Sequence, residues 1–78
     1  MIRELDTVAL THDIDEYGLI QSDMGVVVHC YEGNVAFEVE FVTAEGKTIA
    51  LLTLTWADIR PVVGREVLHA RELVPVMV

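Results

Sequence analysis

The sequence holds a single cysteine and no long hydrophobic run, and each of these shortages excludes a class of protein. One thiol, Cys30, cannot form an internal disulfide, which argues against a disulfide-stabilised secreted domain and is typical of a reducing compartment. Residues 1–6 lack the apolar core of a signal peptide. No apolar run approaches the roughly 20 residues of a membrane-spanning helix. We therefore expect a cytoplasmic protein that makes no membrane contact.

Basic residues are scarce as well. Five Lys and Arg residues stand against thirteen Asp and Glu residues, so the formal net charge is −8. Affinity for nucleic acid comes mainly from basic side chains that neutralise phosphates, so we expect no nucleic-acid partner. An acidic surface either keeps a small apolar domain in solution or favours a basic protein partner.

Apolar residues are abundant, at 53% of the chain, and they alternate with polar ones. Residues 26–32 and 35–42 show this alternation around Gly33-Asn34, where glycine suits the positive φ of a two-residue hairpin turn. Counting back from the turn gives a register with one apolar face, as a half-buried hairpin requires. The predicted pairs on that core face are Cys30 with Phe37, Val28 with Val39, and Val26 with Phe41.

Three further strands complete the predicted fold. Residues 47–54 fold back onto the hairpin with Ala50 beside Val39 and Leu52 beside Phe37, and residues 6–11 and 59–62 form short strands. The predicted fold class is all-β, a small SH3-like five-stranded barrel over residues 1–62. Residues 63–78 form an additional C-terminal tail, which we expect to pack on the barrel or on a second subunit.

Six segments between Glu4 and Val62 carry a family resemblance: residues 4–8 (ELDTV), 17–19 (YGL), 23–29 (DMGVVVH), 38–42 (EVEFV), 48–50 (TIA) and 58–62 (DIRPV). By these segments the chain resembles domain-of-unknown-function family 4926, a family of small bacterial proteins. The resemblance implies no assigned activity. Members often look like one half of a two-protein unit, which implies an antitoxin-like or immunity-like role by analogy.

Two groups of residues could bind a metal or act in catalysis, but the pattern of each argues against an enzymatic site. His12 and the carboxylates of residues 13–16 are possible metal ligands, but the glycine spacing of a calcium-binding loop is missing. His29 and Cys30 are adjacent on a strand, so their side chains point to opposite faces and cannot act as a nucleophile and base. We expect no catalytic residue, no metal site and no cofactor.

His29 and Trp56 allow further alternatives. The predicted register places His29 opposite Glu38, where the pair is either a surface ion pair or a pH-responsive contact. Trp56 either closes one end of the barrel or contributes to a ligand groove. A metal- or pH-responsive regulator, built on His12 or on His29, is therefore one alternative function.

The outer face of the predicted sheet is more apolar than a small monomer should leave exposed. We expect it to be covered by the tail, by a second copy of the chain, or by both, and predict a homodimer. The primary functional hypothesis is a non-enzymatic protein-interaction module of unknown biological role. The alternative is an antitoxin-like or immunity-like protein that neutralises a cognate enzyme. The candidate interaction face comprises Val27, His29, Tyr31, Ile49 and Leu51.

Overall fold

Five β-strands and two single-turn 3₁₀ helices make up the structure, a computed structural model that describes residues 1–64. The prediction that residues 63–78 form a packed tail therefore falls, from residue 65 on, outside the described residues. Within the described part, no helix is long and apolar enough to cross a membrane. In chain order the elements are β1 (Thr7–Leu10), η1 (Asp15–Tyr17), β2 (Met24–Cys30), η2 (Glu32–Asn34), β3 (Ala36–Val42), β4 (Thr48–Thr55) and β5 (Ile59–Pro61).

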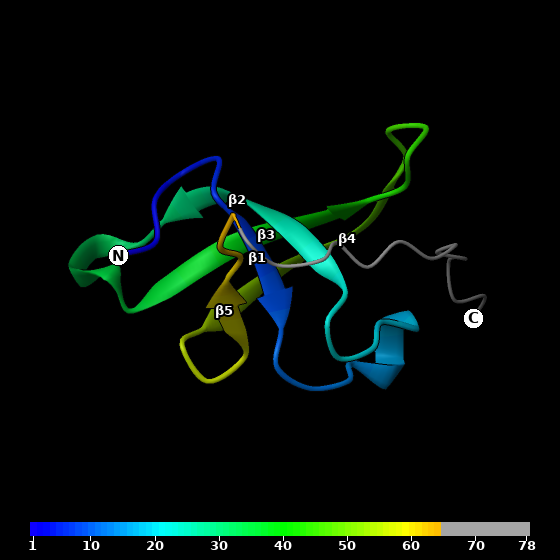
Figure 1. Cartoon of the computed structure of the whole chain (residues 1–78), viewed down its shortest axis with the longest axis horizontal. Coiled ribbons are helices and arrows are strands. Elements are labelled where there is room, and N and C mark those ends of the chain that lie inside the picture. Colours follow the sequence, from blue (N-terminus) through cyan, green and yellow to red (C-terminus); the bar gives the residue numbers. More distant parts are fainter. Residues whose placement is uncertain (65–78) are drawn as a thin grey trace.

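The strands form one antiparallel sheet in the order β4-β3-β2-β1-β5 (Figure 1). This confirms an all-β fold with five strands. Among residues 1–64, β4 and β5 are the two sheet edges and do not pair with each other, so the described sheet is not closed into a barrel. Pro61 lies in the edge strand β5, as its missing N–H requires.

The core lies against one face of the sheet and is centred on β3. Phe37, Val39 and Phe41 are fully buried, because every second residue of a strand points to the same side. Phe37 is thus confirmed as a central core residue, although its partner on β4 is Leu54 and not Leu52. The other large, fully buried side chains are Ile2, Val8, Leu10, Leu19, Val27 and Ile59.

Ile2 is a core residue that sequence patterning missed, because it lies outside any strand. The segment before β1 runs along β2, where the Leu5 N–H donates to the Val27 carbonyl at 2.7 Å and the Val27 N–H donates to the Asp6 carbonyl at 2.9 Å. Asn34 fixes the same segment from the hairpin end, since its side-chain amide donates to the Ile2 carbonyl at 3.0 Å. These contacts hold Ile2 over the core.

A β-bulge in β2 corrects the predicted hairpin register. Near the turn the predicted pairs of Cys30 with Phe37 and of His29 with Glu38 are confirmed. The predicted two-residue turn is wrong, because η2 (Glu32–Asn34) lies between the two strands and the Tyr31 N–H donates to the Ala36 carbonyl. Farther along, Val27 pairs with Val39, so one extra residue, Val28, is inserted in β2. The insertion reverses the alternation that the sequence suggested. The prediction that Val27 faces outward is therefore wrong: its side chain is buried, whereas that of Val28 is exposed.

The pairing of β3 with β4 is displaced from the predicted register by two residues. Ala50 pairs with Phe41 instead of Val39, and Leu52 pairs with Val39 instead of Phe37. A shift of two keeps each side chain on its predicted face, because the strand repeat is also two. The register shifts again between Phe41 and Val42 and leaves Ile49 as an extra residue in β4. Ile49 is half-buried and packs against the core, so its assignment to the outer face is also wrong.

Candidate functional site

The side of β2, β3 and β4 that faces away from the core is the most distinctive surface of the described residues. We call it the outer face. Its apolar members are exposed to differing degrees, from 39–41% for Val28, Tyr31 and Val42 to 56% for Leu51. The outer face includes Val26, Val28, His29, Tyr31, Glu38, Glu40, Val42, Leu51 and Thr53. Val26 pairs with Glu40, so its predicted place on the core face opposite Phe41 is wrong.

Three of the five residues predicted for the interaction face lie on it: His29, Tyr31 and Leu51. Val28 and Val42 were missed. A pattern signal existed for Val42, which alternates in step with Glu38 and Glu40. No signal in a single sequence marks the bulge that turns Val28 outward.

Hydroxyl groups hold the carboxylate of Glu38 at the centre of the outer face. The Tyr31 hydroxyl donates to Glu38 Oε1 at 3.0 Å, and the Thr53 hydroxyl donates to the same oxygen. The carboxylate thereby joins β3 to β4 and to the residue that follows β2. The hydrogen bond to Glu38 raises the pKa of the Tyr31 phenol above its ordinary value, because losing the proton would place two negative charges side by side.

Glu40 has a similar environment, since the Thr48 hydroxyl donates to its Oε2 at 2.7 Å. Within residues 1–64, Glu38 and Glu40 contact neutral hydroxyl groups and no basic side chain. Hydroxyl donors orient a carboxylate but leave its charge in place. The outer face therefore combines exposed apolar side chains with two positioned negative charges.

His29 makes different contacts from those predicted. Its backbone pairs with that of Glu38, but its Nδ1 lies 3.9 Å from Glu4 Oε1, and its ring packs edge-on against Tyr31 with the centroids 4.8 Å apart. Glu38 bonds to Tyr31 and Thr53 instead. The predicted His29–Glu38 ion pair is therefore wrong, because the bulge at Val28 and the adjacent Tyr31 hydroxyl change which side chain reaches the carboxylate.

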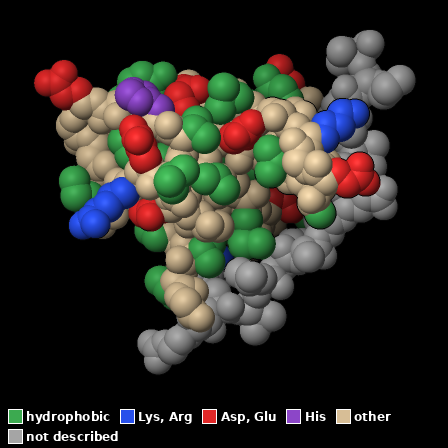
Figure 2. Space-filling view, turned by 90° about the horizontal axis from the view of Figure 1, so that it is seen from above, with side chains coloured by type: hydrophobic (Ala, Val, Ile, Leu, Met, Phe, Trp, Pro, Cys, Tyr) green, Lys and Arg blue, Asp and Glu red, His purple; other side chains and the backbone are tan. Residues whose placement is uncertain are grey.

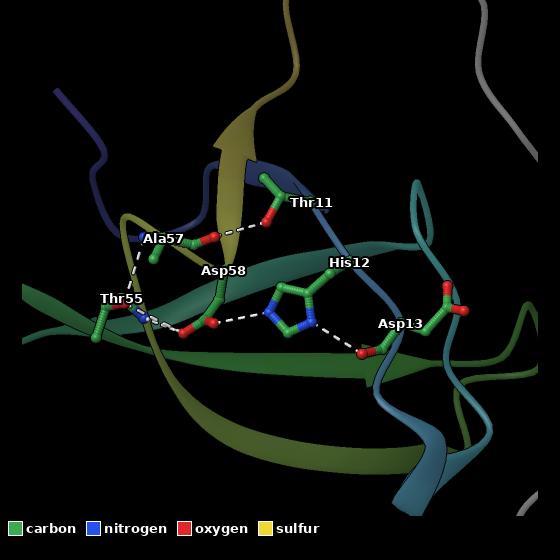
Figure 3. Close-up of polar contacts among 6 residues, drawn as sticks. All are labelled: Thr11, His12, Asp13, Thr55, Ala57 and Asp58. Carbon is green, nitrogen blue, oxygen red and sulfur yellow. Dashed lines mark hydrogen bonds and ion pairs between the residues drawn. The ribbon is translucent and has the colours of Figure 1, made fainter.

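A second polar site joins the end of β1 to the turn between β4 and β5 (Figure 3). His12 Nε2 lies 2.8 Å from Asp58 Oδ1, and His12 Nδ1 lies 2.8 Å from the Asp13 carbonyl oxygen. Nearby, the Thr11 hydroxyl donates to the Ala57 carbonyl at 2.7 Å. The two segments are 46 residues apart in the chain, so only tertiary folding brings them together.

Asp58 also organises the turn itself. Its Oδ2 accepts the Thr55 N–H at 2.9 Å and the Thr55 hydroxyl at 3.2 Å, while its own N–H donates to the Thr55 carbonyl at 2.9 Å. One carboxylate thus closes the β4–β5 turn with Oδ2 and holds His12 with Oδ1. Short polar side chains that bond to nearby backbone are typical of such turns.

His12 and Asp58 each shift the pKa of the other. The hydrogen bond to Asp58 raises the pKa of His12, with a further contribution from the Asp13 carbonyl. The same hydrogen bond to His12 lowers the pKa of Asp58. Both ring nitrogens face acceptors, and only the protonated imidazolium can donate from both. The arrangement therefore favours a charged imidazolium bonded to a charged carboxylate.

The acidic residues near His12 do not form the cluster that the sequence suggested. The Asp13 side chain accepts the Gln21 N–H at 2.8 Å, and Asp15 and Glu16 lie in η1. Within residues 1–64, no three His, Cys, Asp or Glu side chains gather as potential metal ligands. The carboxylate that His12 meets belongs to Asp58, which spacing along the sequence could not indicate.

Cys30 and Trp56 take structural positions. Cys30 is half-buried with its Sγ 3.8 Å from the Ile2 carbonyl oxygen, on the side of the strand opposite to the exposed His29. The Trp56 indole donates to the Asn34 carbonyl at 2.8 Å and packs edge-on against Phe37, with the ring centroids 5.5 Å apart. Trp56 therefore packs over the core residue Phe37, as expected if it closes one end of the fold, while its side chain stays 45% exposed.

Comparisons with known proteins place the chain in a family. Neither the curated proteins nor the solved structures gave a match. A family model described as a domain of unknown function matches residues 4–61, which include all five strands of the sheet. By this match over most of its length, the chain belongs to the domain-of-unknown-function family DUF4926.

Proposed function

We propose that this protein is a non-enzymatic interaction module that binds a basic protein partner through the outer face. The observation that carries the proposal is that exposed Tyr31 and Leu51 lie beside the carboxylates of Glu38 and Glu40, which contact no basic side chain within residues 1–64. Apolar and aromatic side chains at the centre of an interface supply most of the binding energy. Carboxylates around them steer a partner of opposite charge and reject partners of like charge.

The distribution of charge supports the same partner class. Residues 65–78 contain two arginines and two glutamates, so the whole formal net charge of −8 falls on residues 1–64. Hydrophobic and acidic side chains alternate across the view in Figure 2, and basic side chains appear there only at the rim. Such a surface speeds association with a basic partner at low ionic strength.

We also propose a specific fold type and a cellular location for the protein. We assign the sheet to an SH3-like barrel, because β1 pairs with both β2 and β5 and so brings the two ends of the domain together. We place the protein in the cytoplasm, which the single unpaired cysteine supports.

An antitoxin-like or immunity-like role is the more specific form of this function. In that case the partner is a basic enzyme, and binding of the outer face blocks its activity. The charge complementarity is the same, and one tight partner is required. Inhibition of a captured enzyme at a one-to-one ratio separates this role from a general interaction module.

The test is affinity capture from cells with the full chain and matched variants. Glu38→Gln with Glu40→Gln removes two charges from the outer face and keeps oxygen acceptors for the neighbouring hydroxyls. The control, Asp15→Asn with Glu16→Gln, removes two charges from η1. We expect a basic protein that the wild type and the control retain, that the outer-face variant loses, and that added salt releases. Equal capture by both double variants would refute the proposal.

A second candidate function, pH-responsive regulation, is favoured by the contact between His12 and Asp58. This contact joins two chain segments through a histidine whose pKa the hydrogen bond to Asp58 raises. Protonation of His12 would hold the end of β1 against the β4–β5 turn, and its loss would loosen that junction. Partner binding measured across the titration range of His12, in the wild type and in His12→Gln, tests this function; identical pH profiles would exclude it.

A further inference from the structure

Within residues 1–64, the outward edge of β4 has backbone groups that pair with no other strand. The Tyr31 N–H donates to the Ala36 carbonyl, so the Ala36 backbone points toward β2. Neighbouring residues of a strand point their backbone groups to alternate sides, so β3 bonds to β4 through the pairs Phe37–Leu54, Val39–Leu52 and Phe41–Ala50. The N–H and C=O groups of Leu51, Thr53 and Thr55 must then point away from β3. Within residues 1–64, no strand pairs with β4 on that side.

Asp58 limits the unpaired stretch at one end. The Thr55 N–H donates to the Asp58 carboxylate, and the Thr55 carbonyl accepts the Asp58 N–H. These two bonds confirm that the Thr55 backbone points outward, and they also occupy it. As far as residues 1–64 are concerned, the N–H and C=O groups of Leu51 and Thr53 remain available to an added strand.

We propose that this edge pairs with the same edge of a second copy, so that β4 and β4 of the partner subunit run antiparallel about a two-fold axis. Leu51 exchanges two backbone hydrogen bonds with Thr53 of the partner subunit, and Thr53 exchanges two with Leu51 of the partner subunit. Leu52 then lies opposite Leu52 of the partner subunit, on the axis. A continuous ten-stranded sheet results, with the two outer faces side by side.

The chemistry of β4 favours a second copy over a foreign peptide. The strand TIALLTLT has no charged residue and no proline, so nothing along it selects a basic or an acidic strand. Long uncharged edges of this kind pair readily with strands of the same character. The arrangement is self-complementary, because the same two residues supply donors and acceptors on both sides. A two-fold pair is also the commonest closed assembly.

The first test is the mass of the full chain by sedimentation equilibrium over a range of protein and salt concentrations. We expect a dimer that dissociates on dilution. Added NaCl should increase the dimer fraction, because each chain carries a net charge of −8 and screening weakens their repulsion. A monomeric mass under all conditions would overturn the proposal. Slow hydrogen exchange of the Leu51 and Thr53 amides in that monomer would mean that another part of the chain covers the edge.

The second test fixes the register by disulfide formation in a Cys30→Ala background. Residues opposite each other without direct hydrogen bonds lie about 4.5 Å apart at Cα, within the range that a disulfide spans. Leu52→Cys should therefore form a covalent dimer under mild oxidation. Val42→Cys is the matched control, because it lies on β3, away from the edge, and should stay monomeric on a non-reducing gel. Equal cross-linking of both variants, or cross-linking of Leu51→Cys in place of Leu52→Cys, would contradict the proposed pairing.

Discussion

The two faces of β3 differ in how they tolerate change. On the core face, Phe37, Val39 and Phe41 are fully buried and pack against β2 and β4. On the outer face, Glu38 and Glu40 accept hydrogen bonds from hydroxyl groups. Removing atoms from the first face leaves a cavity, whereas removing them from the second admits water. The same strand therefore carries the stability of the domain on one side and its proposed binding surface on the other.

Among the substitutions on the two faces, Phe37→Ala should reduce the stability of the protein the most. It removes a fully buried ring that also supports Trp56, and should lower the free energy of unfolding by about 3–5 kcal/mol. Chemical denaturation checks this, with Glu38→Ala as the control on the opposite face. Glu38→Ala should cost much less, since Tyr31 and Thr53 can bond to water instead. Similar losses for the two variants would contradict the assignment of the faces.

Gly25→Ala probes how closely β2 approaches β3. A Cβ at this position would lie 2.7 Å from Val39 Cγ1, 2.9 Å from Phe41 Cε1 and 3.0 Å from the Glu40 carbonyl oxygen. Overpacking of a rigid core typically costs about 1–3 kcal/mol, so we expect a clear drop in the melting temperature. Gly46→Ser is a contrasting change in an open turn, where a Cβ meets no atom within 4 Å but the positive φ disfavours any side chain. A fully stable Gly25→Ala protein would show that the two strands can separate.

Val27→Thr and Val28→Thr test the bulge directly. The two residues are neighbours of the same type, but Val27 is buried and Val28 is exposed. A buried hydroxyl without a partner costs about 1–3 kcal/mol, whereas an exposed substitution usually changes stability by less than about 0.5 kcal/mol. Thermal unfolding should therefore separate the pair. A larger loss of stability in Val28→Thr than in Val27→Thr would mean that β2 has no bulge and that its side chains alternate as the sequence suggested.

Loss of the His12–Asp58 contact should reduce stability the least, and the size of the reduction should depend on pH. The raised pKa of His12 means that its contribution is complete below the ordinary value of 6.5 and is lost as the pH rises through the folded-state value. The lowered pKa of Asp58 means that its contribution is present above 3.8 and is lost as the pH falls. Relative to wild type, Asp58→Asn should thus be least stable between about pH 4 and 6.5.

Melting temperatures across that range check the prediction, and His12→Gln serves as the second variant. The two variants should approach the wild type as the pH rises above the His12 titration, apart from a constant loss in Asp58→Asn from its weakened turn. The effect is small because the pair is partly exposed to water. A stability difference that does not change with pH would mean that the contact carries no charge-dependent energy.

The sequence by itself determined the five strands and most of their faces. Alternation in β3 placed Phe37 inward and Glu38 outward, and a two-residue error in the β3–β4 register left these faces unchanged because the strand repeat is two. The tertiary structure decided the single-residue insertions at Val28 and Ile49, which follow from strand twist and packing and leave no mark in the pattern. It also decided the contact of His12 with Asp58, because residues far apart in the chain meet only when the sheet brings β1 beside β5.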